Sequence, residues 1–163
     1  MNIFKLLKIC SILCIVPLSC GANDTNNTNN TVYDYYEYNK KVSKDEIIEN
    51  FESIFKLKSD INEVFGSSKY DKDMERNLFV KKELLSVIKK LKEIFSNLNN
   101  LNCRDIENYF NDIFNTLMSN LAGTQYRYKK GLINSTKPYE VIVDLISYCV
   151  RLQCNAELYI QYP

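Results

Sequence analysis

Apolar residues recur every three or four positions along most of the chain after Ser43, which is the spacing of one face of an α-helix. Four such stripes follow one another, and no alternating apolar and polar run is long enough to suggest a strand. Four stripes of similar length can enclose one common core. The pattern therefore predicts an all-α fold, an antiparallel four-helix bundle over residues 43–163.

The first two predicted helices carry end signals as well as stripes. Ser43 and Glu46 have the spacing of a capping box, and Gly66 is expected to end the first helix in a left-handed conformation. The polar loop 67–73 leads into the second helix. The first stripe comprises Ile47, Phe51, Ile54 or Phe55, Ile61 and Phe65; the second comprises Leu78, Leu84, Ile88, Leu91, Phe95 and Leu98.

The second helix is also expected to carry a basic outer face. Such a face is usually solvated, although a patch for heparin or anionic lipid is the alternative. The lysines concerned are Lys81, Lys82, Lys89, Lys90 and Lys92.

The last two helices are delimited in the same way. Asn102 is expected to cap the third helix and Gly123 to close it. A polar loop, 124–137, then precedes Pro138, which suits a first helical turn. The third stripe comprises Ile106, Phe110, Ile113, Leu117 and Leu121, widened by Phe114 and Met118; the fourth comprises Ile142, Leu145, Cys149, Leu152, Ala156 and Tyr159.

Length and composition agree with a single helical domain. The chain has 163 residues, enough for one compact domain, and only four glycines and three prolines. The connections from the first helix to the second and from the second to the third are short. Short connections join antiparallel neighbours, so the predicted order is up-down-up-down.

Residues 1–21 are expected to be a signal peptide. Lys5 and Lys8 precede a short apolar run, 9–16, which is too short to span a bilayer. Ordinary signal peptidase cleavage would release a secreted protein. The alternative is a bacterial lipoprotein signal, because Leu18-Ser19-Cys20-Gly21 resembles a motif that is cut before a cysteine and acylated at its thiol. Lipidation would then fall on Cys20.

Residues 22–42 are expected to form a disordered tether, because their first part is rich in Asn and Thr and lacks apolar residues. This part contains three glycosylation sequons, and a fourth lies in a predicted loop. An Asn/Thr-rich tract also creates sequons by composition alone. The candidate glycosylation sites are Asn23, Asn26, Asn29 and Asn134.

The second part of the tether interleaves tyrosines with carboxylates. In a flexible extracellular segment this pattern suits tyrosine sulfation, and the sulfates would pair with Arg or Lys of a basic partner. The alternative is that the rings pack on the bundle as an amphipathic strip. The partner-binding candidates are Tyr33, Asp34, Tyr35, Tyr36, Glu37 and Tyr38.

Three cysteines remain once the signal is removed, which allows one internal bridge in an oxidising compartment. Cys103 begins the third helix and Cys154 lies near the end of the fourth, so a Cys103–Cys154 disulfide is predicted. Cys149 belongs to the core stripe and is expected to be a free thiol or an alternative partner. Three separated cysteines without histidine do not suit a zinc site.

The residue types present disfavour several classes of function. There is no histidine, so no Ser-His or Cys-His catalytic pair can form. Phosphate-binding and metalloprotease motifs are absent. The formal net charge of +1 gives no basic footprint for nucleic acid. We therefore expect no enzymatic activity, no cofactor, no metal and no nucleic-acid partner.

The leading interpretation is a secreted extracellular protein that binds a host or partner protein, with an immunomodulatory role as one form of this. The alternative is a lipid-anchored surface lipoprotein or adhesin, attached to a membrane only through acylated Cys20. A signal ending in Cys, a polar tether and a helical domain resemble spirochaetal surface lipoproteins in outline. A third interpretation is an oligomerising module whose stripes form a seam between chains.

Overall fold

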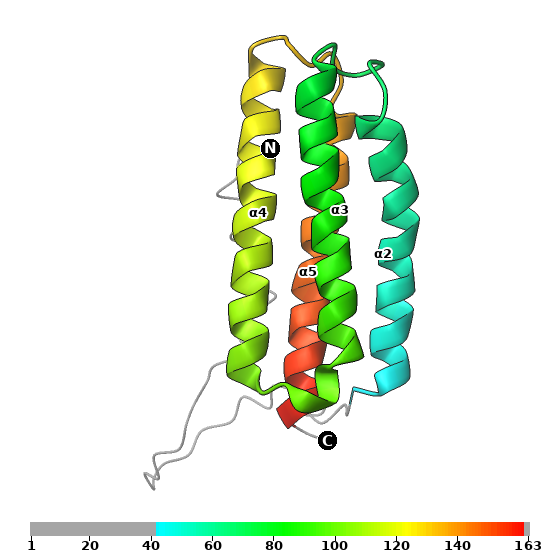
Figure 1. Ribbon diagram of the computed structural model, residues 1–163, viewed down its shortest axis with the longest axis vertical. Helices are drawn as coiled ribbons and strands as arrows, with labels where there is room; N and C mark the ends of the chain where they lie inside the picture. Colours follow the sequence, from blue (N-terminus) through cyan, green and yellow to red (C-terminus); the bar gives the residue numbers. More distant parts are fainter. Residues whose placement is uncertain (1–41, 162–163) are drawn as a thin grey trace, which may run out of the picture. The chain divides into compact units, whose positions relative to one another are not determined.

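The computed structural model describes residues 42–161. Four long helices make up almost all of this range (Figure 1): α2 (Lys44–Phe65), α3 (Met74–Ser96), α4 (Cys103–Lys129) and α5 (Lys137–Gln161), with a 3₁₀ turn, η2 (Leu98–Asn100), between α3 and α4. The described range contains no strand, only an isolated bridge between Asp71 and Ile133. The predicted all-helical class is confirmed.

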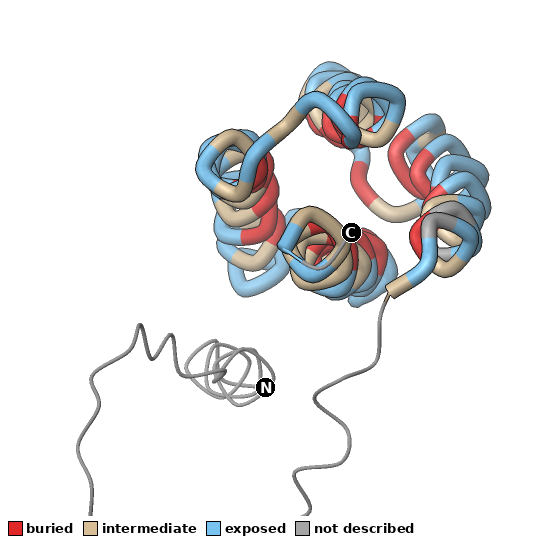
Figure 2. The backbone as a smooth tube through the Cα atoms, turned by 90° about the horizontal axis from the view of Figure 1, so that it is seen from below, coloured by how far each residue is buried: buried red, intermediate tan, exposed pale blue. Residues whose placement is uncertain are grey.

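The four helices surround one core. Helix α2 packs against α3 and α5, and α4 packs against the same two helices. Seen along the helices, the buried positions line the inward side of each (Figure 2). The core is a single cluster to which every helix contributes fully buried side chains, for example Ile54, Leu84, Phe110 and Leu145. The apolar stripes thus bury one another within one chain.

Helix starts agree closely with the sequence. The Ser43 hydroxyl accepts from the backbone N–H of Glu46, and the Glu46 carboxylate accepts from that of Ser43, which completes the predicted capping box. Asn102 caps α4 and forms the same reciprocal pair with Asp105. Pro138 lies in the first turn of α5, as predicted.

Helix ends agree less well. Gly66 follows α2, but its φ is −97°, so the predicted left-handed stop is wrong. Glycine is required there for another reason, because an added Cβ would collide with the carbonyl oxygen of Asn62. Gly123 does not close α4 either, since the helix continues to Lys129 and the loop spans only 130–136. The left-handed glycine is Gly131, with φ of 69°.

Burial resolves one open alternative in α2 and corrects two predicted positions in α3. Leu78 is 52% exposed, because Asn77 and Val80 occupy the inward side of that turn. Of the two candidates in α2, Ile54 is buried and Phe55 is 44% exposed. Lys81 is half-buried rather than fully part of the outer face. The other lysines of the predicted basic face, Lys82, Lys89, Lys90 and Lys92, are exposed.

Candidate functional site

Most residues predicted to act outside the helices lie beyond the described range. The signal peptide, the Cys20 acylation site, the sequons at Asn23, Asn26 and Asn29, and the Tyr33–Tyr38 segment all precede residue 42. Asn134 is described: it is exposed in the loop between α4 and α5. Its backbone N–H donates to the carbonyl oxygen of Tyr70 at 3.3 Å, which fixes the sequon against loop 66–73.

The cysteines lie at different depths. Cys149 is a free, buried thiol in the core, and burial raises its pKa to about 12. Cys103 is a free, half-buried thiol at the start of α4. The Tyr159 hydroxyl donates to the Asn99 side chain at 3.1 Å, which places the end of α5 beside η2. Cys154 lies five residues before Tyr159, about 7.5 Å back along α5 from the end that contacts η2. The Cys103–Cys154 disulfide stays a prediction.

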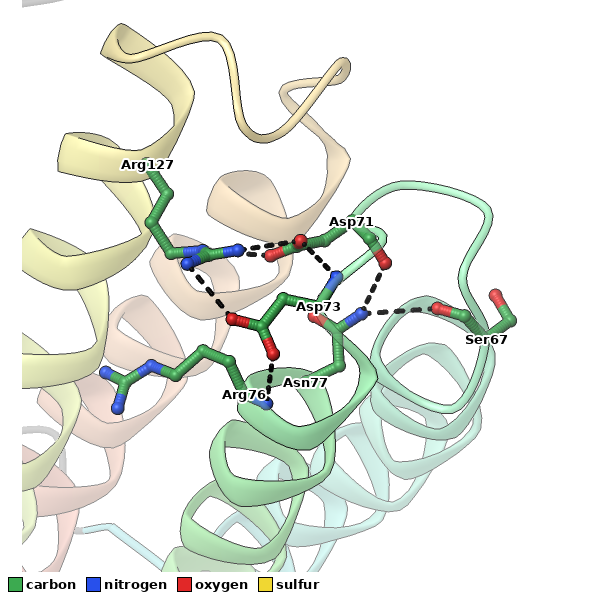
Figure 3. A network of polar contacts seen from close by, with 6 residues as sticks. All are labelled: Ser67, Asp71, Asp73, Arg76, Asn77 and Arg127. Carbon is green, nitrogen blue, oxygen red and sulfur yellow. Dashed lines mark hydrogen bonds and ion pairs between the residues drawn. The ribbon is translucent and has the colours of Figure 1, made fainter.

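A buried ion pair joins α4 to the loop between α2 and α3, and the sequence did not reveal it. Arg127 donates two hydrogen bonds to Asp71, at 3.0 and 2.8 Å, and its third nitrogen lies 3.4 Å from Asp73 (Figure 3). The Asp71 side chain is only 3% exposed. The hydrogen bond to Asp71 raises the pKa of Arg127. Bidentate pairs of this kind fix geometry as well as charge.

The same loop is held by further polar contacts. The Asn77 side-chain amide donates to the backbone carbonyls of Asp71 and Ser67, at 2.9 and 3.3 Å. The Asp73 carboxylate accepts from the Arg76 backbone at 3.0 Å and so caps α3. Every charged group in this cluster has a structural partner. The cluster therefore anchors the loop.

A groove lies between α3 and α4, with a volume of about 600 Å³. Its floor is apolar, because Ile94 and Ile113 are 4% and 1% exposed, and Leu101 is half-buried. Its rim is polar or aromatic, formed by Lys90, Glu93, Asn97, Asn100, Tyr109 and Asp112. An apolar floor with a few polar rim groups is typical of binding sites.

Tyr109 is the principal side chain of this groove, since 48% of it is exposed. The Glu93 carboxylate lies 3.8 Å from the Lys89 ammonium group, one turn earlier on α3. Both side chains are exposed, so this ion pair is weak and leaves the carboxylate accessible to a ligand. The Asn97 side chain donates to the Glu93 backbone carbonyl at 3.2 Å, which orients one rim amide. The groove thus combines a large exposed ring, a carboxylate and an apolar floor. None of these groups forms a nucleophile–base pair.

The α3–α4 seam continues toward the opposite ends of these helices as an exposed aromatic and cationic surface. The Arg76 guanidinium lies 5.0 Å from the ring centroid of Phe79, which is 50% exposed. Arg76 also approaches α4, because a Cβ added at Gly123 would lie 3.2 Å from its terminal nitrogen. We call the combined surface the α3–α4 face; it comprises Arg76, Phe79, Lys90, Glu93, Tyr109 and Asp112.

A smaller groove lies between α2 and α5, with a volume of about 340 Å³. Its lining is mainly polar, and the Arg151 guanidinium lies 4.9 Å from the Tyr148 ring centroid. Only Leu57 contributes a buried apolar side chain to it. This groove lacks the apolar floor of the first, so we place the candidate site on the α3–α4 face.

Comparison with family models, curated proteins and solved structures found no significant match to this chain. Among residues 42–161, no three Cys, Asp or Glu side chains gather in a way that would hold a metal ion. No helix of that range combines the length and apolarity needed to cross a bilayer.

Proposed function

We propose that this chain is an exported, non-enzymatic binding protein whose α3–α4 face contacts a protein partner outside the cell. The observation that carries the proposal is an apolar groove with Tyr109, 48% exposed, on its rim, together with Phe79, 50% exposed and about 16 Å away along α3. Exposed aromatic and arginine side chains beside an apolar depression are the features enriched in binding hot spots.

We further infer that the helices follow the up-down-up-down order. Support comes from the contact of Phe51 with Phe95, whose ring centroids are 5.4 Å apart, between the first half of α2 and the end of α3. Support also comes from the contact of Tyr159 with Asn99, between the end of α5 and η2. Short loops connect successive helices, as antiparallel neighbours require.

Export is supported by the amino-terminal signal pattern. The Tyr/acidic segment Tyr33–Tyr38 is a second contact region in this proposal, through carboxylates or sulfates that meet a basic partner. A glycan on Asn134 would extend from the loop end of the domain, because that residue is exposed between α4 and α5. The groove lies on a different part of α4, so the glycan leaves it accessible.

Capture of a partner by the immobilised mature chain tests the proposal. We expect the double variant Phe79→Ala, Tyr109→Ala to weaken capture by about tenfold or more, since a pair of hot-spot aromatics commonly contributes that much. The matched control is Tyr128→Ala, because Tyr128 is 45% exposed on α4 and does not line the groove. Equal loss in the control, or no loss in the double variant, removes the α3–α4 face from the proposal.

The Tyr/acidic segment is tested separately. Replacing Tyr33, Tyr35, Tyr36 and Tyr38 with Phe removes the hydroxyls, and with them any sulfate, while it retains the rings. Reduced partner affinity supports recognition through the hydroxyls or sulfates. Unchanged affinity removes that mode of recognition and leaves the α3–α4 face as the proposed contact.

A second candidate is a lipid-anchored surface protein acylated at Cys20. The observation that favours it is the Leu18-Ser19-Cys20-Gly21 sequence directly before an Asn/Thr-rich stretch of the length a spacer would need. Metabolic labelling with a fatty-acid analogue distinguishes the two candidates. Label that is lost in Cys20→Ala supports the anchor, and absence of label in the unaltered protein supports secretion.

A further inference from the structure

Helices α2 and α3 lie side by side but carry opposite charges. Helix α2 contains three basic and six acidic side chains, a net of −3. Helix α3 contains six basic and three acidic side chains, a net of +3. A domain that belongs to a nearly neutral chain thus presents one acidic and one basic helix on the same side.

These charges are directed at solvent. In α2, exposed acidic side chains lie on the outward side at Asp45, Glu49, Glu52 and Glu63, with the exposed Lys56 between the last two. In α3, Lys82, Lys89 and Lys92 are exposed. No ion pair joins Glu49, Glu52 or Glu63 to an α3 lysine, so the two rows do not neutralise each other across the seam.

Apolar side chains accompany these charges. Phe55 is 44% exposed, and its ring packs edge-on against Phe51 at 5.1 Å, beside Phe95 of α3. Phe55 therefore lies at the seam between the two helices. Leu78 of α3 is 52% exposed. The surface thus contains exposed apolar area together with two rows of opposite charge.

We propose that this α2–α3 surface binds a second copy of the same chain, related by a two-fold axis that runs parallel to the helices. Rotation about that axis brings α2 of one copy opposite α3 of the other, at both halves of the interface. Each acidic row then meets a basic row. Rotation about an axis perpendicular to the helices would instead place α2 against α2 and α3 against α3, which like charges disfavour.

The spacing of the charges fits this arrangement. Rotation about a two-fold axis parallel to the helices leaves the position of each residue along the helix direction unchanged. With α2 and α3 antiparallel, as proposed above, the Phe51–Phe95 contact places Glu52 near the height of Lys92. Glu63 lies about 16 Å further along α2, and Lys82 lies about 15 Å further along α3. Two pairs of opposite charge therefore align at once in each half of the interface.

The available area is also adequate. Two helices of 22 and 23 residues are each about 33 Å long. Packed about 9 Å apart, they present a surface roughly 20 Å wide, or on the order of 650 Å² per copy. This approaches the roughly 800 Å² per partner of a standard specific interface. The α3–α4 face belongs to the other side of α3, so the dimer would display two copies of it.

Charge reversal tests the dimer and its symmetry together. We expect sedimentation equilibrium of the mature chain to show a dimer, and the basic-to-acidic variant Lys82→Glu, Lys92→Glu to weaken it by about tenfold or more. The acidic-to-basic variant Glu52→Lys, Glu63→Lys should weaken it equally. A 1:1 mixture of these two variants should form a heterodimer, because every row then faces an opposite row.

Matched controls carry the same change in net charge on other helices. Arg104→Glu with Lys129→Glu, and Glu107→Lys with Asp144→Lys, alter exposed positions of α4 and α5 and should leave the dimer intact. Circular dichroism confirms that each variant keeps its helices. A monomeric unaltered chain, equal weakening in the controls, or two reversed variants that fail to pair when mixed would each overturn the proposal.

Discussion

Arg127 and Asp71 are joined by two hydrogen bonds, at 3.0 and 2.8 Å, across 56 residues of sequence. These hydrogen bonds attach the loop between α2 and α3 to the end of α4. Asp71 is the only charged residue of the described range that is buried, with 3% of its side chain exposed against 19% for Arg127. This pair fixes the loop end of the domain on which Asn134 is displayed.

Removal of Arg127 should therefore be costly. Arg127→Ala leaves the Asp71 carboxylate buried without its partner, which we expect to lower the free energy of unfolding by about 3 kcal/mol. Replacement of both residues by apolar ones of similar size should cost less than Arg127→Ala alone. Urea unfolding followed by circular dichroism measures both variants, with Arg104→Ala as the exposed-arginine control. A near-zero effect of Arg127→Ala would contradict this account of the pair.

Substituting alanine for the glycines of the helical domain should change its stability in different directions. Gly66→Ala should destabilise the domain, because the new Cβ would collide with the Asn62 carbonyl. Gly131→Ala should cost about 1 kcal/mol, since its φ of 69° strains a residue with a side chain. Gly123→Ala should stabilise by up to about 1 kcal/mol, because the residue lies inside α4 and the Arg76 guanidinium, 3.2 Å from the new Cβ, ends a flexible side chain that can shift. Thermal unfolding of the three variants measures the order, and a stabilised Gly66→Ala would refute the collision argument.

Alanine substitutions at two leucines of α3 should change the free energy of unfolding by very different amounts, although both residues belong to the stripe predicted from the sequence. Leu84 is fully buried, so Leu84→Ala should lower the free energy of unfolding by about 2–5 kcal/mol. Leu78 is 52% exposed, so Leu78→Ala should change it by less than about 0.5 kcal/mol in the monomer. Urea unfolding at low protein concentration tests the pair. Equal losses would show that the described position of Leu78 is wrong.

The thiols should differ in reactivity. Burial raises the pKa of Cys149 to about 12, so in the reduced chain it should resist alkylation at pH 8 until the domain unfolds, while half-buried Cys103 reacts sooner. The pKa of this thiol is 9.0 in the unfolded chain and about 12 in the folded domain. Between these two pH values the unfolded chain loses the proton first, so the stability present below pH 9 is lost as the pH rises toward 12. Cys149→Ala should reduce this loss of stability at alkaline pH. Timed alkylation with mass mapping checks the reactivities, and rapid native labelling of Cys149 would contradict its burial.

The sequence predicted what local rules control. Helix starts followed from Ser43 and Asn102, because a capping side chain acts on its own first turn. All five residues of the predicted α4 stripe are buried, because they share one regular spacing, but the buried polar residues Asn120 and Thr124 were not predicted. The end of α4 was not, because Gly123 in a helix costs only about 1 kcal/mol and the packing beyond it outweighs that cost.

The candidate site depended on information that spacing does not carry. Asp71 and Arg127 are far apart in sequence, and each alone resembles an ordinary surface charge. The groove lies where the end of α3 and η2 meet the first half of α4, and no periodicity revealed that meeting. Tyr109 had a weak signal: it is an aromatic residue just off the core stripe of Ile106 and Phe110. The charge difference between α2 and α3 was visible in the sequence, but its meaning depends on these helices being neighbours.

The most direct test of the account is the intact mass and location of the protein made by its own cell. Export predicts a chain outside the cytosol that has lost its first residues, beginning near Ala22, or at an acylated Cys20 in the lipid-anchored form. Glycans or sulfates would appear as further mass. A chain that retains Met1 and remains in the cytosol would contradict export, and with it the proposed extracellular partner.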